Sequence, residues 1–300
     1  MSSFTRRDFL GRSLQTGIGL STLGTTLATN ALAADRPMKD DVSLAAWSLV
    51  RAFNEKKWKN LDLPRICRED FNVNGIEFVN SFFELPVSGY LKKLKQNADD
   101  YSVKLVLIMV DGEGNLSSTD KSERMQTALN HRKWLDIAAV LGCHAIRCNV
   151  GGPQKGYDTD IMNRAAESIG SIVEYASQYP LNVVLENHGG ASSNPDMMID
   201  LIKKVNSPHL GVLPDFGNIY EFDRYEAIKK LAPYAKGISV KTHFKKDGTH
   251  PEYDIARLIK ICQEVGYHGF WGIEQESQEA DAWQAVRWTK EIIDKTVFGK

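Results

Sequence analysis

Short apolar runs recur along the chain, and longer stretches of mixed apolar and polar residues separate them. Eight such runs lie at residues 42–47, 75–79, 103–110, 145–150, 182–185, 210–213, 237–240 and 270–273. They are spaced by about 25 to 40 residues, the length of one strand followed by one helix. Most are rich in Val, Ile and Leu without strict alternation, which is typical of parallel strands buried on both faces.

The stretches between the runs are predicted to be helices. Residues 124–141 carry one apolar stripe with a helical period, and residues 160–179 and 254–265 behave likewise. Pro195 suits the first turn of a helix, and Gly142 suits a helix end. Eight strands alternating with helices predict an α/β fold, a single closed (β/α)8 TIM barrel. An open, doubly wound sheet is the alternative, but no G-x-G-x-x-G turn follows the first strand.

The first 34 residues have the features of an export signal. Arg6 and Arg7 precede a charge-free segment, 13–32, and an A-x-A-like cleavage site ends at Ala33. This pattern predicts a twin-arginine signal peptide over residues 1–34, with the barrel domain at 35–300. An amphipathic N-terminal helix is the alternative. No later segment is apolar for long enough to span a bilayer, so we expect a periplasmic protein without membrane contact after cleavage.

Composition excludes several other classes of protein. The formal net charge is −1 at pH 7 and no long cluster of Lys and Arg occurs, which argues against nucleic acid and anionic membranes as partners. The four cysteines show no metal-binding or C-x-x-C spacing. We expect buried free thiols, although Cys143 and Cys148 could pair in an oxidising compartment. The sequence leaves open whether the chain forms a homo-oligomer.

Costly polar groups stand where the predicted strands end. The loops at residues 111–120 and 151–157 follow strands and so belong to the same, chemically active face of a barrel. The groups on this face are Glu77, Asp111, Arg147, Asn149, Glu186, His188, Asp215, Ser239, Lys241, His243, Glu274 and Glu276. Carboxylates gathered at a barrel mouth would repel one another unless a cation lay among them. Oxygen ligands with one nitrogen suit Mn²⁺, Mg²⁺, Co²⁺ or Zn²⁺.

Each of these residues also has an ordinary structural interpretation. Glu186 could cap a helix, and Asp215 after Pro214 could form an Asx turn. His243 precedes a polar turn, and Lys241 could be a surface lysine.

Four motifs resemble the sugar phosphate isomerase/epimerase family of xylose-isomerase-like barrels, and above all its exported twin-arginine members. They are LENHGG (185–190), LPDFGN (213–218), SVKTHF (239–244) and GYHGFWGIEQE (266–276). The resemblance implies a divalent metal ion bound by Glu186, Asp215, Glu274 and one ligand from the seventh strand. The family's histidine position there is Ser239. His243, which has the same strand parity, or a water molecule is the alternative ligand.

The resemblance further implies enediolate chemistry on a sugar, with Glu186 and Glu274 as the acid/base pair. His188, Lys241, Glu77 and Asn149 would bind the carbohydrate substrate. We therefore expect a metal-dependent isomerase or epimerase acting on a ketose, aldose or keto-sugar. A lyase that cleaves a 3-keto-glycoside or dehydrates an inosose by the same chemistry is the first alternative. A non-catalytic periplasmic carbohydrate-binding barrel is the second.

Overall fold

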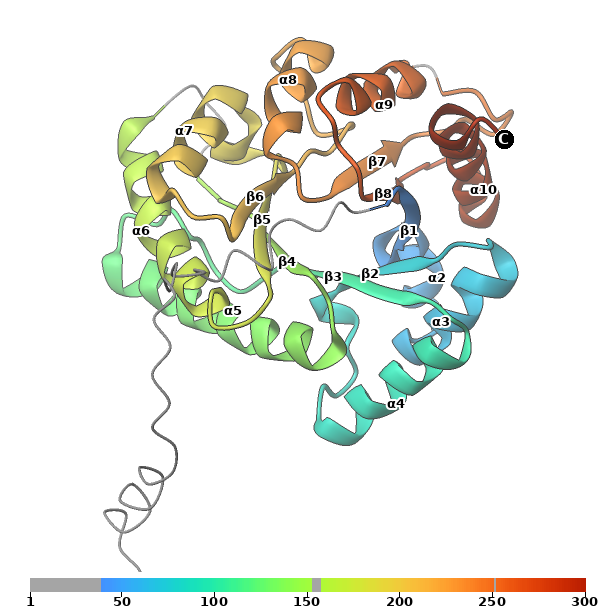
Figure 1. The fold of residues 1–300 in the computed structure, drawn as a ribbon, viewed down its shortest axis with the longest axis horizontal. Coiled ribbons are helices and arrows are strands. Elements are labelled where there is room, and N and C mark those ends of the chain that lie inside the picture. Colours follow the sequence, from blue (N-terminus) through green and yellow to red (C-terminus); the bar gives the residue numbers. More distant parts are fainter. Residues whose placement is uncertain (1–38, 153–157, 251) are drawn as a thin grey trace, which may run out of the picture. The chain divides into compact units, whose positions relative to one another are not determined.

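The computed structural model describes residues 39–152, 158–250 and 252–300. The predicted export signal and most of the loop at 151–157 lie outside these residues. Eight strands are present in the described part, each close to its predicted apolar run (Figure 1). They are β1 (Asp41–Ala45), β2 (Gly75–Val79), β3 (Lys104–Val110), β4 (Ala145–Cys148), β5 (Asn182–Glu186), β6 (Leu210–Leu213), β7 (Ile238–Thr242) and β8 (Phe270–Gln275).

The strands form one parallel sheet that closes on itself. Their order is β6-β5-β4-β3-β2-β1-β8-β7, so that β1 pairs with both β2 and β8. Bridges between Val212 and Ala235 and between Asp215 and Ser239 join the β6 side to the β7 side. This closure confirms the predicted (β/α)8 barrel and excludes the open sheet.

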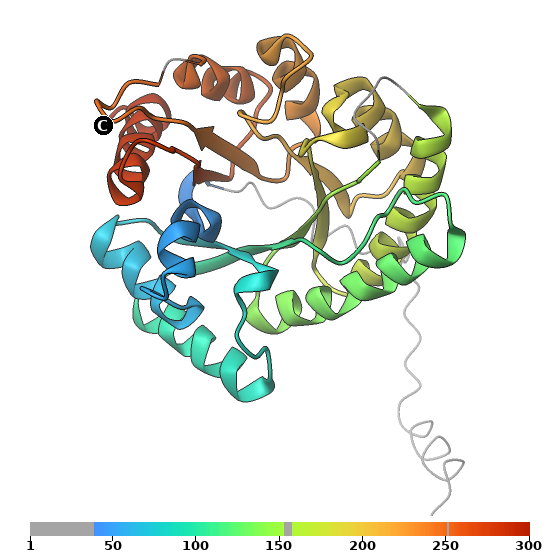
Figure 2. The same ribbon diagram turned by 180° about the vertical axis from the view of Figure 1, so that it is seen from behind.

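Helices surround the strands when the barrel is seen from either end (Figures 1 and 2). The α-helices of the described residues are α2 (Val50–Asn54), α3 (Leu63–Arg65), α4 (Ser88–Asp100), α5 (Lys121–Leu141), α6 (Thr159–Ala176), α7 (Pro195–Val205), α8 (Arg224–Leu231), α9 (Ile255–Glu264) and α10 (Ala282–Ile293). Asx caps begin many of them; the Asp120 carboxylate, for example, accepts from the backbone of Glu123. Pro195 is the first residue of α7, and Gly142 ends α5 with φ +79°, both as predicted.

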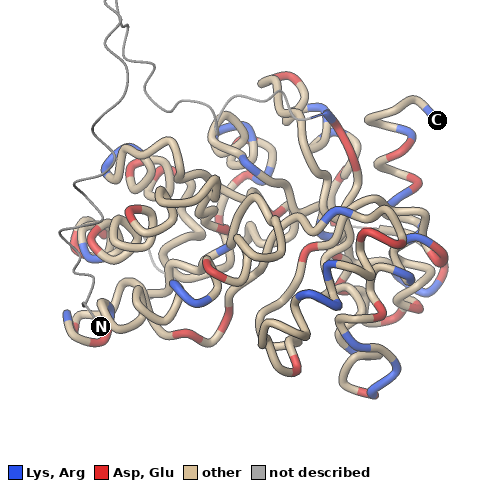
Figure 3. Tube along the Cα trace, turned by 60° about the horizontal axis from the view of Figure 1, so that its bottom comes forward, with Lys and Arg blue, Asp and Glu red and all other residues tan. Residues whose placement is uncertain are grey.

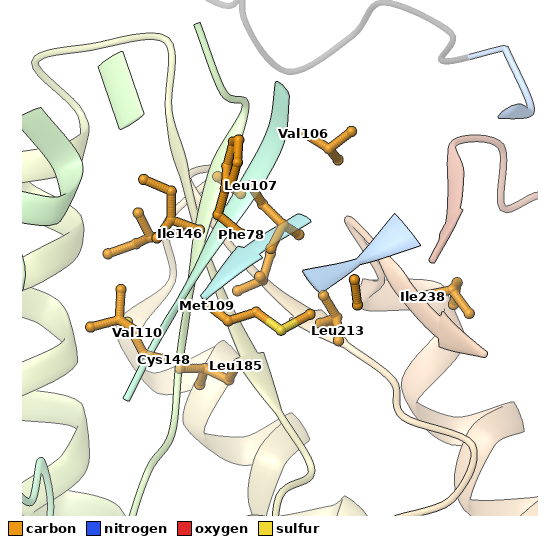
Figure 4. Packing of buried hydrophobic residues seen from close by; sticks show 14 of the residues in the cluster. Phe78, Val106, Leu107, Met109, Val110, Ile146, Cys148, Leu185, Leu213 and Ile238 are labelled. Carbon is orange, nitrogen blue, oxygen red and sulfur yellow. The ribbon is translucent and has the colours of Figure 1, made fainter. Parts of the chain in front are cut away.

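The interior of the barrel is filled by large apolar side chains. Leu107 and Met109 of β3 and Leu213 of β6 belong to one buried cluster (Figure 4). Polar side chains gather at the carboxyl ends of the strands, where (β/α)8 barrels carry their chemistry.

Outside the core the polar surface is mixed. Acidic and basic residues are interspersed along the helices of the described residues (Figure 3). Within the described ranges, no helix combines the length and apolar character needed to cross a bilayer.

Candidate active site

Three buried carboxylates meet at the carboxyl ends of the strands. Glu186 is the last residue of β5, Asp215 follows β6, and Glu274 lies near the end of β8. Their ligand-type oxygen atoms lie within 4.8 Å of one another, and we call these three residues the acidic triad. The barrel thus brings together carboxylates that are far apart in sequence, as the strand-end argument predicted.

The turn after β6 fixes Asp215. Its Oδ1 accepts hydrogen bonds from the backbone N–H groups of Gly217 (2.7 Å) and Asn218 (2.8 Å). This is the Asx turn considered from the sequence. It directs the other oxygen, Oδ2, towards Ser239 and Lys241. The side chain of Asn187 pairs with both the N–H and the C=O of Asp215, so the β5 and β6 ends are held in register.

Lys241 of β7 extends its ammonium group into the triad. Its Nζ lies 3.1 Å from Glu274 Oε1, 3.3 Å from Asp215 Oδ2 and 3.4 Å from Glu276 Oε1. Only 1% of the residue is exposed. Burial alone would lower the pKa of Lys241, but the carboxylates of Asp215 and Glu274 raise it well above its usual range. Lys241 is therefore a fixed cation within the site and not a surface lysine.

Arg147 is a second buried cation, and the sequence prediction did not assign it a role. Its Nε lies 2.8 Å from Glu186 Oε2, and one terminal nitrogen lies 2.6 Å from Asp111 Oδ1. A charged residue within the apolar run 145–150 was the available signal, because a buried charge requires a partner.

Burial changes the protonation of Glu186. Desolvation raises its pKa to about 8, although Arg147 opposes the shift; the other triad carboxylates reinforce it. Asn218 donates to Glu186 Oε1 at 3.1 Å. The Glu186 carboxyl can therefore hold a proton near neutral pH.

A cavity of about 390 Å³ opens beside the triad. Its lining combines an apolar wall with charged groups: Trp47, Val79, Ser81, Met109, Asp111, Arg147, His188 and Glu274. Burial lowers the pKa of His188, and Arg147 and Lys241 lower it further, which favours the neutral imidazole. The volume and the mixed lining suit a small polar molecule such as a monosaccharide.

The predicted substrate-binding residues occupy different places. His188 lines the cavity. Lys241, Glu77 and Asn149 are not among the residues that line it. Asn149 donates to Asp111 Oδ1 at 2.8 Å, the same oxygen that pairs with Arg147. Glu77 lies deeper in the barrel, where Ser43 donates to its Oε1 at 2.5 Å.

The structure does not bring His243 to the triad. β7 ends at Thr242, one residue earlier, and the His243 ring lies 6.4 Å from that of His250. Strand parity therefore no longer applies at His243. The position facing the triad is Ser239, whose Oγ lies 2.8 Å from Asp215 Oδ2 and 3.0 Å from Glu274 Oε2.

The acidic triad could bind a metal ion by its ligand atoms. As the side chains stand, however, the Lys241 ammonium contacts oxygens of Asp215 and Glu274 that such an ion would need. A divalent ion lies about 2.0 to 2.6 Å from its oxygen ligands, which would put it against the ammonium. The triad with Lys241 in this position does not fit a divalent ion.

Eight parallel strands with a polar cluster at their carboxyl ends define a (β/α)8 barrel of the kind that carries enzyme active sites. A sequence model described as xylose isomerase-like TIM barrel matches residues 69–292, and the chain belongs to this family. A curated relative, the uncharacterized protein MJ1311 of Methanocaldococcus jannaschii, is 23% identical over 248 residues, 77% of this chain and 84% of that protein.

Solved structures with the same fold include sugar epimerases and a dehydratase. D-allulose 3-epimerase from Methylomonas sp., in complex with D-allulose, has a TM-score of 0.69 at 13% identity, covering 87% of this chain and 98% of that one. The 3-keto-D-glucoside 4-epimerase YcjR from E. coli has a TM-score of 0.64 at 14% identity, covering 85% and 98%. A probable 3-DHS dehydratase, AsbF from Bacillus anthracis, has a TM-score of 0.65 at 16% identity, covering 84% and 98%. At these identities the likeness is one of fold.

Proposed function

We propose that this chain is a sugar isomerase or epimerase that moves a proton through an enediolate of a ketose, aldose or keto-sugar. The observation that carries the proposal is the convergence of Glu186 and Glu274 within 4.8 Å, with Glu274 on the wall of a sugar-sized cavity. Epimerases of ketoses and keto-glucosides share the fold.

The two glutamates have different surroundings, which suits them to opposite roles. Glu274 contacts the Lys241 ammonium and lines the cavity, so it is the candidate base for a C–H proton next to a substrate carbonyl. Glu186, whose pKa burial raises, is the candidate acid that returns a proton to carbon. Arg147 lines the same cavity and can stabilise the negative oxygen of the enediolate. A divalent metal ion is not included in this function, because Lys241 contacts the oxygens that would bind it.

Solvent-proton exchange tests the proposal. The purified chain is incubated with a panel of ketoses, aldoses and 3-keto-glucosides in D₂O, and deuterium entry at the carbon next to the carbonyl is measured by NMR. Glu186→Gln and Glu274→Gln should each lower the exchange rate by about 10²- to 10⁴-fold with circular dichroism unchanged. Glu264→Gln, the same change at an exposed position, should have no effect. Undiminished exchange in both Glu186→Gln and Glu274→Gln would contradict the assignment of these residues as acid and base.

A lyase is the second candidate, and the same panel separates it. The fold is shared with a probable dehydratase, and loss of a group from the β carbon needs the same first proton removal. Release of aglycone from a 3-keto-glucoside would favour the lyase; clean interconversion of two epimers would favour the epimerase. Saturable sugar binding without exchange or release would favour the carbohydrate-binding barrel.

We also propose export by the twin-arginine route, on the basis of Arg6, Arg7 and the charge-free segment after them. In a bacterial host, cell fractionation should recover the chain in the periplasm. The pair Arg6→Lys and Arg7→Lys should hold it in the cytoplasm. Equal periplasmic recovery of this double variant would argue against the route.

A further inference from the structure

Two buried cations lie against the acidic triad. Arg147 contacts Glu186 at 2.8 Å, and Lys241 contacts Asp215 and Glu274 at 3.3 and 3.1 Å. Every triad carboxylate is thus paired with a positive side chain. The chain itself therefore offsets part of the repulsion that would otherwise call for a bound cation.

From this geometry we infer that Lys241 is the resident cation of the site, taking the place in which the triad would otherwise hold a divalent metal ion. The inference deepens the proposed function, and it rests on that function only where activity is measured. It means that the barrel performs its chemistry without a divalent metal, and that the triad recovers metal affinity when the ammonium is removed.

The fold is built around the lysine in this position. A Cβ atom added at Gly217 would lie 2.6 Å from Lys241 Cδ and 2.8 Å from its Cγ, so only glycine leaves room for the aliphatic stem. The hydroxyl of Tyr253 donates to the Lys241 carbonyl at 2.7 Å and anchors the backbone. Asn218 Oδ1 and Glu276 Oε1 lie 3.4 Å from Nζ on its remaining sides. These contacts hold the ammonium against the triad and not toward solvent.

The strand position opposite the triad favours the same conclusion. Ser239 Oγ lies between Asp215 Oδ2 and Glu274 Oε2, and its single hydrogen can serve one of them at a time. A neutral hydroxyl is a weaker metal ligand than an imidazole. Beyond its three carboxylates, the triad therefore lacks a strong fourth ligand among the described residues around it.

Metal binding by variants tests the inference directly. The purified chain, Lys241→Met and the surface control Lys230→Met are titrated with Mn²⁺ and followed by electron paramagnetic resonance and calorimetry. Lys230 of α8 pairs with the exposed Asp196 and lies outside the site. Removing a positive charge from within about 4 Å of the ion should raise Mn²⁺ affinity at least about 100-fold in Lys241→Met. The double variant Ser239→His/Lys241→Met, with an added imidazole, should bind more tightly still.

The wild-type chain provides a second readout, which stands even where Lys241→Met fails to fold. Elemental analysis after purification should find far less than one divalent ion per chain, and neither Mn²⁺ nor EDTA should move its Tm. A stoichiometric divalent ion in the wild type, or a Tm that falls with EDTA and recovers with Mn²⁺, would overturn the inference. Equal Mn²⁺ affinity in the wild type and a folded Lys241→Met would do the same.

Activity separates this inference from the proposed function. Proton exchange that persists in EDTA supports both. Exchange that requires added Mn²⁺ retains the isomerase and rejects Lys241 as the cation. Absence of exchange under every condition rejects the isomerase, and the metal titrations then decide on Lys241 alone.

Discussion

Glu77 is a carboxylic acid sealed inside the barrel, and its ionisation should make the stability of the chain depend on pH. The residue is 1% exposed, and a Cβ added at Gly272 would lie 2.5 Å from its Oε1, so the carboxyl occupies space that glycine leaves. Burial raises its pKa from 4.5 to about 8, with a contribution from Glu274, while the hydrogen bond from Ser43 opposes the shift.

The sign of the effect follows from linkage. Below pH 4.5 the carboxyl is protonated in both the folded and the unfolded chain. As the pH rises from 4.5 to about 8, the unfolded chain releases the proton and the folded chain keeps it, so folding is progressively disfavoured. A shift of that size, at about 1.4 kcal/mol per pKa unit, corresponds to as much as about 5 kcal/mol lost by pH 8.

Glu77→Gln should remove this loss, because an amide does not ionise. Of this loss, about 3.5 kcal/mol falls between pH 5 and pH 8. For a chain of this length, 1 kcal/mol corresponds to roughly 2 °C in Tm, so the Tm difference between variant and wild type should shift in the variant's favour by up to about 7 °C between these pH values. Any fixed cost of burying the amide is the same at every pH and cancels from the slope. Glu264→Gln, at an exposed site, should track the wild type. Parallel Tm curves for Glu77→Gln and wild type would refute the burial argument.

Three further predictions concern the packing of the site and the thiols. Arg147→Met leaves two carboxylates without their cation and should lower the free energy of unfolding at neutral pH by about 3 to 5 kcal/mol; a urea titration showing under 1 kcal/mol would contradict this. Gly217→Ala should cost about 1 to 3 kcal/mol through the clash with Lys241, whereas Gly89→Ala, with open space around it, should cost nothing; equal midpoints would count against the clash. The four cysteines are free and buried, so Ellman's reagent should find no reactive thiol in the native chain and four after unreduced denaturation; two would reveal a disulfide.

The fold was readable from the sequence because its signals are local. Apolar runs separated by one helix length predict β–α units, and a closed barrel is the arrangement that buries eight such strands on both faces. Closure of the barrel then places the carboxyl ends of all eight strands at the same end of the barrel. For this reason the sequence alone predicts that Glu186, Asp215 and Glu274 meet, and in the structure they do.

The sequence could not predict the distances between side chains at the carboxyl ends of the strands. Strand parity predicts the side on which a residue lies only while the strand continues, and β7 ends before His243. The sequence likewise indicated that the triad needs a cation but could not show which one. That depends on side-chain paths set by packing: the room left by Gly217 and the anchor on Tyr253 direct Lys241 into the triad, and Asp111 and Glu186 hold Arg147 beside it. The sequence by itself determined the barrel and the meeting of the acidic triad, because these follow from local periodicity and from closure of the barrel. Tertiary structure alone decided which cationic side chains contact the triad, because long side chains from non-adjacent strands meet only where the packing allows them.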